Sequence, residues 1–230
     1  MSNYPNMMHR ALVPDLGSCY GHAWQKMLDK FGELIVISII SIVLSLPTIG
    51  LSRHEELPWM VALYLVSFSL IYSVFFYSPI EYGVSFAFLR AARDEEVRIK
   101  DIFEVFNNYF QAVGASVLVS IIVIFGFICC IVPGIIFACK LVFVPYLIVD
   151  RKLDCIEAIQ TSWNMTTGYT GTIFLMGLLA IPILLLGLLC CCVGVVVSGI
   201  WIELAFAYLY IAVTQTESAP VPENGDESTL

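Results

Sequence analysis

The sequence has few charged residues of either sign. Of its 230 residues, 11 are Lys or Arg and 19 are Asp or Glu, so 13% of the chain is charged while 59% is hydrophobic. Soluble domains usually contain about 25% charged residues, and this composition therefore excludes an ordinary soluble protein. The formal charge of -8 also argues against nucleic-acid binding, because contacts to phosphates require a basic surface. The mean hydropathy of +0.87 predicts a protein that lies in a membrane.

Residue clusters typical of catalysis or metal binding are also scarce. The three histidines, His9, His22 and His54, lie far apart in the chain. No cysteine cluster has the Cys-x-x-Cys spacing and the nearby His of a zinc site. The first thirty residues lack an apolar core followed by a small-residue cleavage site, so no cleavable signal peptide is expected. We therefore predict no catalytic site, no metal and no cofactor.

Five of the eight cysteines form two clusters within apolar runs. Cys129 and Cys130 make up the first cluster, and Cys190, Cys191 and Cys192 make up the second. Free cysteine packs as a small apolar residue, which is the favoured interpretation. A disulfide between the two clusters is the alternative if both face an oxidising compartment.

Long apolar runs account for the high hydropathy. A transmembrane helix needs about 20 mainly apolar residues, and six runs come near this length or exceed it. The sequence therefore predicts an all-α polytopic membrane protein with six transmembrane helices in three hairpins, and a kink at Pro79, which lacks a backbone donor. The membrane domain is expected over residues 15–214, between an N-terminal segment, 1–14, and a disordered acidic tail, 215–230. The runs cover residues 32–51, 58–88, 113–132, 134–149, 171–192 and 194–213.

Lys and Arg are distributed unevenly among the links between these runs. Three lie in the first thirty residues, four between the second and third runs, and two between the fourth and fifth, whereas the opposite side has only Arg53. Basic residues are retained on the cytoplasmic side of a membrane. Both termini are therefore expected in the cytoplasm, and the predicted location is the cytoplasmic (inner) membrane.

Each predicted hairpin follows a shorter amphipathic segment. These segments begin near residues 15, 99 and 154 and are expected to form interfacial helices, so the membrane domain is interpreted as a possible threefold repeat. In the third segment, Asp154 and Glu157 have the spacing of a capping box. Gly168 is expected to follow the helix in the left-handed conformation.

Three stretches of the chain carry a resemblance to a known family. They are Ile-Val-Pro-Gly-Ile-Ile, which contains Pro133 and Gly134, Phe-Val-Pro-Tyr-Leu-Ile-Val-Asp at 143–150, and the segment 157–168 with Glu157, Ser162 and Gly168. The chain resembles, over most of 16–213, a group of uncharacterised bacterial six-helix membrane proteins and the membrane domain of membrane-anchored glycerophosphodiester phosphodiesterases. The resemblance implies a six-helix bundle with cytoplasmic interfacial helices. It implies no enzymatic activity, because the hydrolytic domain of those fusions is a separate soluble unit for which 230 residues leave no room.

Two ionisable residues are predicted to lie deep in the membrane. At 1.5 Å per helical residue, Lys140 lies about 9 Å inward of Gly134 and Glu203 about 14 Å inward of Gly194. Charges at such depth are costly and usually face protein, water or one another. The favoured interpretation is an ion pair between Lys140 and Glu203, and the alternative is a polar site for a substrate or a proton. Glu81 is a third candidate for such a site, because it follows the Pro79 kink.

These observations support two hypotheses about function. The first is a non-enzymatic integral membrane protein that acts as a structural or accessory partner, with a protein-binding surface on its cytoplasmic face. The second is a transporter or lipid-handling protein with a polar site around Lys140, Glu203 and Glu81. The first is favoured because no catalytic constellation is visible and three amphipathic segments share one side.

Overall fold

The computed structural model describes residues 14–50, 59–189 and 191–218, and in these residues all regular secondary structure is helical. This confirms the predicted all-α class. The predicted N-terminal segment and most of the acidic tail lie outside the described residues. The elements are α1 (Leu16–Asp29), α2 (Phe31–Gly50), α3 (Trp59–Tyr72), the π-helical turn η1 (Ser73–Tyr77), α4 (Ser78–Ala92), α5 (Ile99–Ile102), the 3-10 segment η2 (Phe103–Asn108), α6 (Tyr109–Cys129), α7 (Ile131–Lys140), α8 (Val144–Asp150), α9 (Cys155–Met165), α10 (Thr170–Leu189) and α11 (Cys191–Ser218).

Five helical stretches in the described chain are long and apolar enough to cross a membrane. They are Leu63–Ala92, Tyr109–Cys129, Ile131–Asp150, Thr170–Leu189 and Val193–Thr216. The chain is therefore a helical, multi-pass membrane protein. The first predicted run corresponds to α2, whose apolar part is a shorter stretch, so the sixth span stays a prediction.

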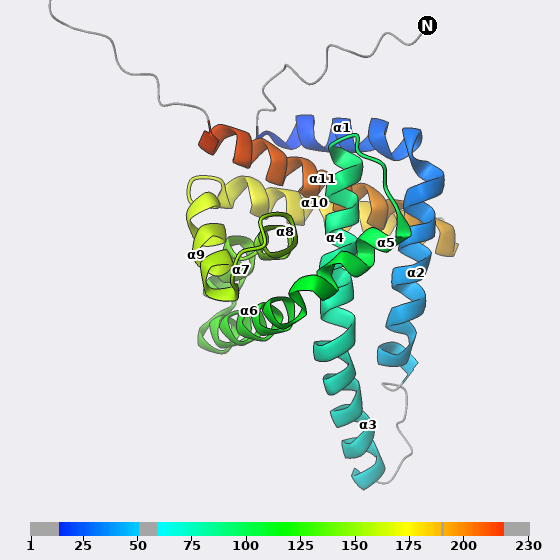
Figure 1. Ribbon diagram of the computed structural model, residues 1–230, viewed down its shortest axis with the longest axis vertical. Helices are drawn as coiled ribbons and strands as arrows, with labels where there is room; N and C mark the ends of the chain where they lie inside the picture. The colour runs from blue at the N-terminus through cyan, green and yellow to red at the C-terminus, as the bar shows by residue number, and fades with distance from the viewer. Residues whose placement is uncertain (1–13, 51–58, 190, 219–230) are drawn as a thin grey trace, which may run out of the picture.

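The hairpins do not run parallel to one another. In Figure 1, α2 lies beside the long helix made of α3, η1 and α4, whereas α11 crosses this helix near its α4 end and packs against α10. Helix α1 lies along α11, where the Trp201 side chain donates a hydrogen bond to the Tyr20 carbonyl at 3.0 Å. The Tyr20 hydroxyl in turn donates to the Met176 carbonyl of α10 at 3.0 Å. The first amphipathic segment is thus fixed to the last hairpin.

Pro79 changes the helix without ending it. Proline has no N–H to donate to the carbonyl four residues earlier, which here is the carbonyl of Phe75. That carbonyl lies in the π-helical turn and accepts a hydrogen bond from the Tyr109 hydroxyl of α6 at 2.7 Å. The irregularity before Pro79 is therefore a π-turn, whose freed carbonyl is bonded by the next hairpin, and a bend of the helix stays a prediction.

Glycines allow the two later hairpins to close tightly. A Cβ on Gly126 of α6 would lie 2.9 Å from the Gly134 Cα of α7. The last hairpin, made of α10 and α11, repeats this pattern, because a Cβ on Gly187 would lie 2.6 Å from the Gly194 carbonyl oxygen. The sequence separated the third and fourth apolar runs at Pro133, but Pro133 and Gly134 both lie inside α7, and the extended residue between the helices is Cys130. Pro133 fits there because the first turn of a helix needs no N–H donor.

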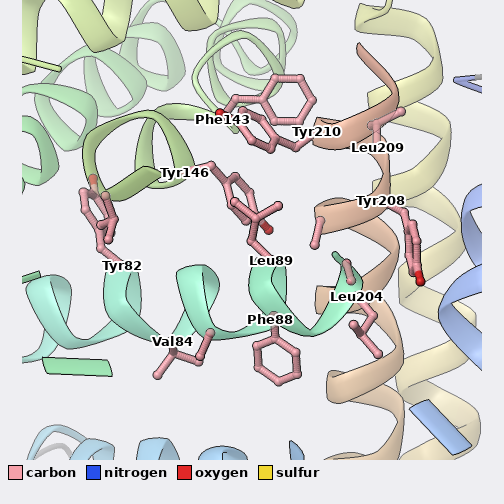
Figure 2. Packing of buried hydrophobic residues seen from close by; sticks show 14 of the residues in the cluster. Tyr82, Val84, Phe88, Leu89, Phe143, Tyr146, Leu204, Tyr208, Leu209 and Tyr210 are labelled. Carbon is pink, nitrogen blue, oxygen red and sulfur yellow. The ribbon is translucent and has the colours of Figure 1, made fainter. Parts of the chain in front are cut away.

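The core forms where α4, α8 and α11 meet. Figure 2 shows Leu89 of α4 facing Tyr146 of α8, beside Tyr210 of α11. The rings of Tyr146 and Tyr210 stack at 5.1 Å between centroids, and Phe143 meets Tyr210 edge to face at 5.6 Å. All four side chains are buried, so this aromatic cluster holds three separate helices together.

Candidate functional site

Lys140 is held by α9 and the residues that follow it. Its Nζ donates a hydrogen bond to the Thr167 hydroxyl at 2.7 Å and lies 3.5 Å from the Trp163 carbonyl oxygen. It also lies 5.4 Å from the centroid of the Trp163 ring, which suits a cation–π contact. Helix α7 ends at Lys140 and α9 ends nearby, and helix C-termini attract cations. Within the described residues Lys140 has no ion pair, so the predicted pairing with Glu203 is wrong.

The carbonyl of Lys140 explains the role of Ser162. The backbone N–H of Val144, which would continue helix α7, bonds to the Leu141 carbonyl at 3.2 Å instead. The Lys140 carbonyl is thereby released, and it accepts hydrogen bonds from the Ser162 hydroxyl at 2.8 Å and the Thr166 hydroxyl at 3.3 Å. Ser162 and Thr166 are fully buried. Both residues therefore join α9 to the break between α7 and α8.

The start of α9 differs from the predicted capping box. Asp154 occupies the N-cap position, but its side chain makes no capping hydrogen bond and accepts one from Gln111 of α6 at 3.2 Å. The capping box with Glu157 is therefore wrong, although Glu157 in the first turn still suits the positive end of the helix. Gly168 has a φ of +98°, which confirms the predicted left-handed residue.

Glu203 and Glu81 influence one another electrostatically, and Lys140 is not among the partners of either. Glu203 on α11 interacts electrostatically with Glu81 on α4, and Tyr77 at the end of η1 interacts with both carboxylates. The electrostatic partners of Tyr146 on α8 include Glu203. Neither carboxylate has a hydrogen bond or an ion pair to the described residues. The structure thus brings together two of the three predicted site residues and adds tyrosines that sequence reasoning missed. We call Glu81 and Glu203 the carboxylate pair.

The residues of this site differ in exposure. Glu81 is exposed on α4, Glu203 is partly buried, and Tyr146 has only 3% of its surface exposed. The site is therefore open on the Glu81 side and closed on the α8 side. It also adjoins the π-turn, and such turns are frequent at functional sites in helices. Tyr77 and Glu81 lie four residues apart on either side of Pro79. This spacing is the sequence signal that identifies this part of the site.

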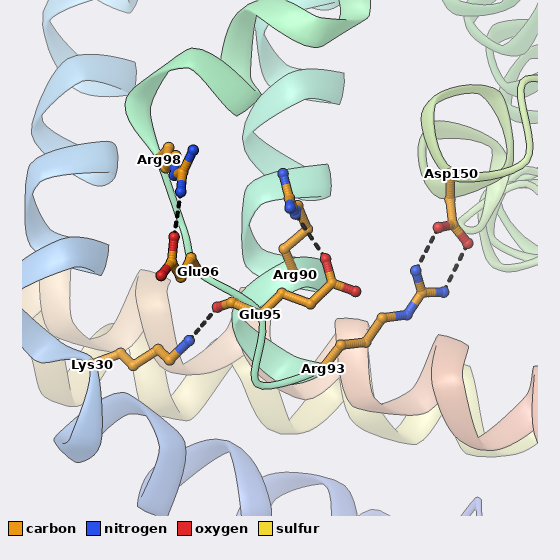
Figure 3. Close-up of polar contacts among 7 residues, drawn as sticks. All are labelled: Lys30, Arg90, Arg93, Glu95, Glu96, Arg98 and Asp150. Atoms are coloured by element: carbon orange, nitrogen blue, oxygen red, sulfur yellow. Dashed lines mark hydrogen bonds and ion pairs between the residues drawn. The ribbon is translucent and has the colours of Figure 1, made fainter.

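A second polar cluster fixes the ends of three helices. Arg93 follows α4 and binds both carboxylate oxygens of Asp150 at the end of α8, at 2.5 and 2.8 Å (Figure 3). The Tyr210 hydroxyl of α11 donates to the same carboxylate at 3.1 Å. The hydrogen bonds to Asp150 raise the pKa of the Arg93 guanidinium, so Arg93 stays charged. Sequence reasoning missed this cluster, which links residues 57 and 60 positions apart.

The loop after α4 neutralises basic residues of the predicted cytoplasmic side. Arg90 forms an ion pair with Glu95 at 2.8 Å, and Arg98 forms one with Glu96 (Figure 3). Lys26 of α1 pairs with Asp94. Lys30, which follows α1, donates a hydrogen bond to the Glu95 carbonyl oxygen. Asp94 has a φ of +66°, a conformation that Asp adopts more readily than most residues. This loop fastens α1 to α4.

The described cysteines are free thiols. Cys129 and Cys130 are exposed, whereas Cys19 of α1 is buried. The side chains of the second cysteine cluster lie outside the described residues, so the disulfide between the clusters stays a prediction. Among the described residues, no group of three or more His, Cys, Asp or Glu could hold a metal ion.

Cys19 is expected to resist alkylation in the folded protein. Burial raises the pKa of its thiol to about 11, and alkylation requires an accessible thiolate. Treatment of the detergent-purified protein with N-ethylmaleimide at neutral pH should modify Cys130 much faster than Cys19, as measured by peptide mass spectrometry. Unfolding in dodecyl sulfate should make the two rates similar. Equal rates in the folded protein would contradict the packing of α1 on α11.

Comparison with known proteins gives no relative for this chain. No family model, no curated protein and no solved structure matches it. The resemblance to the phosphodiesterase membrane domain therefore stays a prediction, and the chain is described by its architecture, a helical multi-pass membrane protein.

Proposed function

We propose that this protein is a non-enzymatic transporter that binds a small inorganic cation at the carboxylate pair in the cytoplasmic membrane, with both termini in the cytoplasm. One observation carries the proposal. Glu81 and Glu203 lie on adjacent apolar helices, interact with one another, and have no basic partner among the described residues.

The cost of charge in a membrane explains why this observation matters. An ionised carboxylate inside an apolar region costs several kcal/mol unless it is paired. Two such groups side by side raise that cost, because like charges repel more strongly at low dielectric constant. A cation between Glu81 and Glu203 removes both penalties. Oxygen atoms are the ligands that hard cations prefer, and the two carboxylates supply them.

The accessory hypothesis receives less support from the same structure. A partner at the predicted cytoplasmic surface would need free charges there, but the loop after α4 engages Lys26, Arg90 and Arg98 within the chain. Exposed Arg151 and Lys152, next to exposed Ile156 of α9, are the residues that still favour such a partner. A stoichiometric protein that remains bound after mild solubilisation, and is lost when Arg151 and Lys152 are replaced by Ala, would favour the accessory role.

Cation binding should depend on the carboxylate pair and not on Lys140. We expect sodium, potassium or calcium chloride to raise the melting temperature of the purified protein at constant ionic strength, balanced with N-methylglucamine chloride. In Glu203→Gln and in Glu81→Gln, the cation concentration needed for the same rise in melting temperature should be at least tenfold higher. The reason is that the remaining carboxylate lacks its neighbour. The matched control is Glu157→Gln, which removes an exposed carboxylate from α9.

Lys140→Met separates the two predicted sites. It should leave cation binding unchanged, because Lys140 is held by Thr167 and Trp163. In proteoliposomes, uptake of the stabilising cation should be lost in Glu203→Gln and kept in Glu157→Gln. Absence of stabilisation by all three salts would refute the proposed function.

A further inference from the structure

Two exposed basic residues directly follow a stretch of the chain that can span a membrane. The stretch Ile131–Asp150 is long and apolar enough to do so, and Arg151 and Lys152 come after it. Neither side chain has an ion pair to the described residues. We propose that Arg151 and Lys152 bind the headgroup of an anionic phospholipid of the surrounding membrane. This lipid site is independent of the carboxylate pair.

The position of the two residues determines what they can meet. Basic residues at the end of a span lie at the level of the lipid headgroups, and an anionic leaflet attracts them. Arginine can hold two phosphate oxygens at once through its guanidinium, and lysine adds a second positive charge. Arg151 and Lys152 therefore match an anionic phospholipid in charge and in depth.

Most other basic residues of the described chain are already bonded within it. Lys140 donates to Thr167, and five further residues bind carboxylates or a carbonyl group in the loop after α4 and in α8. These five are Lys26, Lys30, Arg90, Arg93 and Arg98. The charges of Arg151 and Lys152 are available to a ligand from outside the chain.

The backbone of Lys152 provides a second observation. Helix α8 ends with a hydrogen bond from the Leu153 N–H to the Leu147 carbonyl at 3.5 Å, and Lys152 has a φ of +54°. A helix end of this kind usually has glycine at the left-handed position, because a Cβ is strained there. Lysine at this position costs stability, which points to a role for its charged side chain outside the fold.

The two other described residues with positive φ do not show this conflict. Gly168 has no Cβ. Asp94 belongs to a residue type that tolerates the left-handed conformation, and its carboxylate forms an ion pair with Lys26. Of the residues that the structure describes, Lys152 alone combines a strained backbone with a charge that no ion pair neutralises.

An exposed apolar residue follows the two charges. Ile156, in the first turn of α9, has 61% of its surface exposed, and Figure 1 shows α9 at the outer edge of the bundle. A phospholipid has apolar chains next to its charged headgroup, so one lipid can contact Ile156 and the basic residues together. A soluble anion would leave Ile156 in water, which favours a lipid over such an anion.

Native mass spectrometry of the full chain can detect this lipid. We would add phosphatidylglycerol and phosphatidylcholine in equal amounts to the detergent-purified protein and measure which lipid remains bound. The wild type should retain phosphatidylglycerol in preference to phosphatidylcholine. With Arg151→Gln and Lys152→Gln combined, half occupancy should need about 25-fold more phosphatidylglycerol, because each basic residue near an anionic surface contributes roughly a factor of five. Equal retention of the two lipids by the wild type would overturn the proposal.

Lys100→Gln is the matched control. Lys100 of α5 is also exposed and also has no ion pair to the described residues, but an acidic residue follows it in the sequence. This change should alter the phosphatidylglycerol concentration for half occupancy less than twofold. An equal effect of Lys100→Gln and Lys152→Gln would contradict a site at Arg151, because attraction by the overall charge would then explain the binding.

Lys152→Gly separates lipid binding from the stability of the fold. It relieves the strain at the left-handed position, so the melting temperature in lipid-free detergent should rise by roughly 2–4 °C. The same variant should need about fivefold more phosphatidylglycerol for half occupancy, because one charge is lost. Misfolding cannot explain a protein that is more stable and binds the lipid less well. Wild-type retention of phosphatidylglycerol, or a protein partner that occupies Arg151 and Lys152 and excludes the lipid, would refute the inference.

Discussion

Replacing Gly83 of α4 with alanine is expected to destabilise the protein strongly. A Cβ at this position would lie 2.0 Å from the Ile102 carbonyl oxygen and 2.8 Å from its carbonyl carbon. Both atoms belong to the backbone of α5, so no side-chain rotation can relieve the clash. Overpacking of this kind typically costs about 1–3 kcal/mol, and a backbone obstacle places the cost at or above the upper value.

The thermal unfolding of the variant in detergent measures this effect. We expect the melting temperature of Gly83→Ala to fall by roughly 6 °C or more, given about 2–4 °C per kcal/mol for a chain of this size. Alanine has the higher helix propensity, by up to about 1 kcal/mol, which offsets part of the loss. The cost should be smaller in a variant that also shortens or moves α5, because the backbone that obstructs the new methyl group belongs to α5.

Gly199 provides the matched control for this substitution. It lies in α11, another long apolar helix, and a Cβ there would meet nothing within 4 Å. Gly199→Ala should keep or slightly raise the melting temperature. If Gly83→Ala melts at the wild-type temperature while Gly199→Ala also does, α5 does not pack on α4 as described.

Gly83 also shows what the sequence could predict and what it could not. The apolar runs predicted the helices, and Pro79 marked the irregular turn, because these features depend on neighbouring residues. The predicted kink at Pro79 suggested an interrupted helix beside Glu81. The structure instead has a continuous α4 with the α5 backbone against it. Contact with a distant segment decided the role of Gly83, and sequence spacing carries no information about such contacts.

The failed Lys140–Glu203 pair has a similar physical cause. Counting 1.5 Å per residue gives depth along a straight helix, but α7 ends at Lys140 and the chain turns before α8. Depth also leaves open which direction a side chain takes around the helix. Glu203 therefore interacts with Glu81, a residue that the sequence had placed in the candidate site for another reason. The tyrosines of the site lie in the core. Their spacing in the sequence does not distinguish them from aromatic residues that only pack there.

Breaking the Arg93–Asp150 pair is the second change with a large expected effect. The pair is bidentate, and Tyr210 adds a third hydrogen bond to the Asp150 carboxylate. Arg93→Met would leave that carboxylate with the Tyr210 bond alone, in a site where 15% of its side chain is exposed. Removing one member of a buried pair costs about 3–5 kcal/mol. Arg93 is 32% exposed, so solvent screening reduces the expected loss to about 2–3 kcal/mol.

The cost should arise from the unpaired charge, and a double-mutant cycle tests this cause. Arg93→Met and Asp150→Leu should each lower the melting temperature by roughly 4–12 °C, whereas the double variant should lose less than the sum of the two, because neither charge is then left alone. Glu96→Gln, which breaks an exposed pair with Arg98, should change the melting temperature little. Strictly additive losses would show that Arg93 and Asp150 contribute separately, and that the ends of α4, α8 and α11 are held by the aromatic cluster instead.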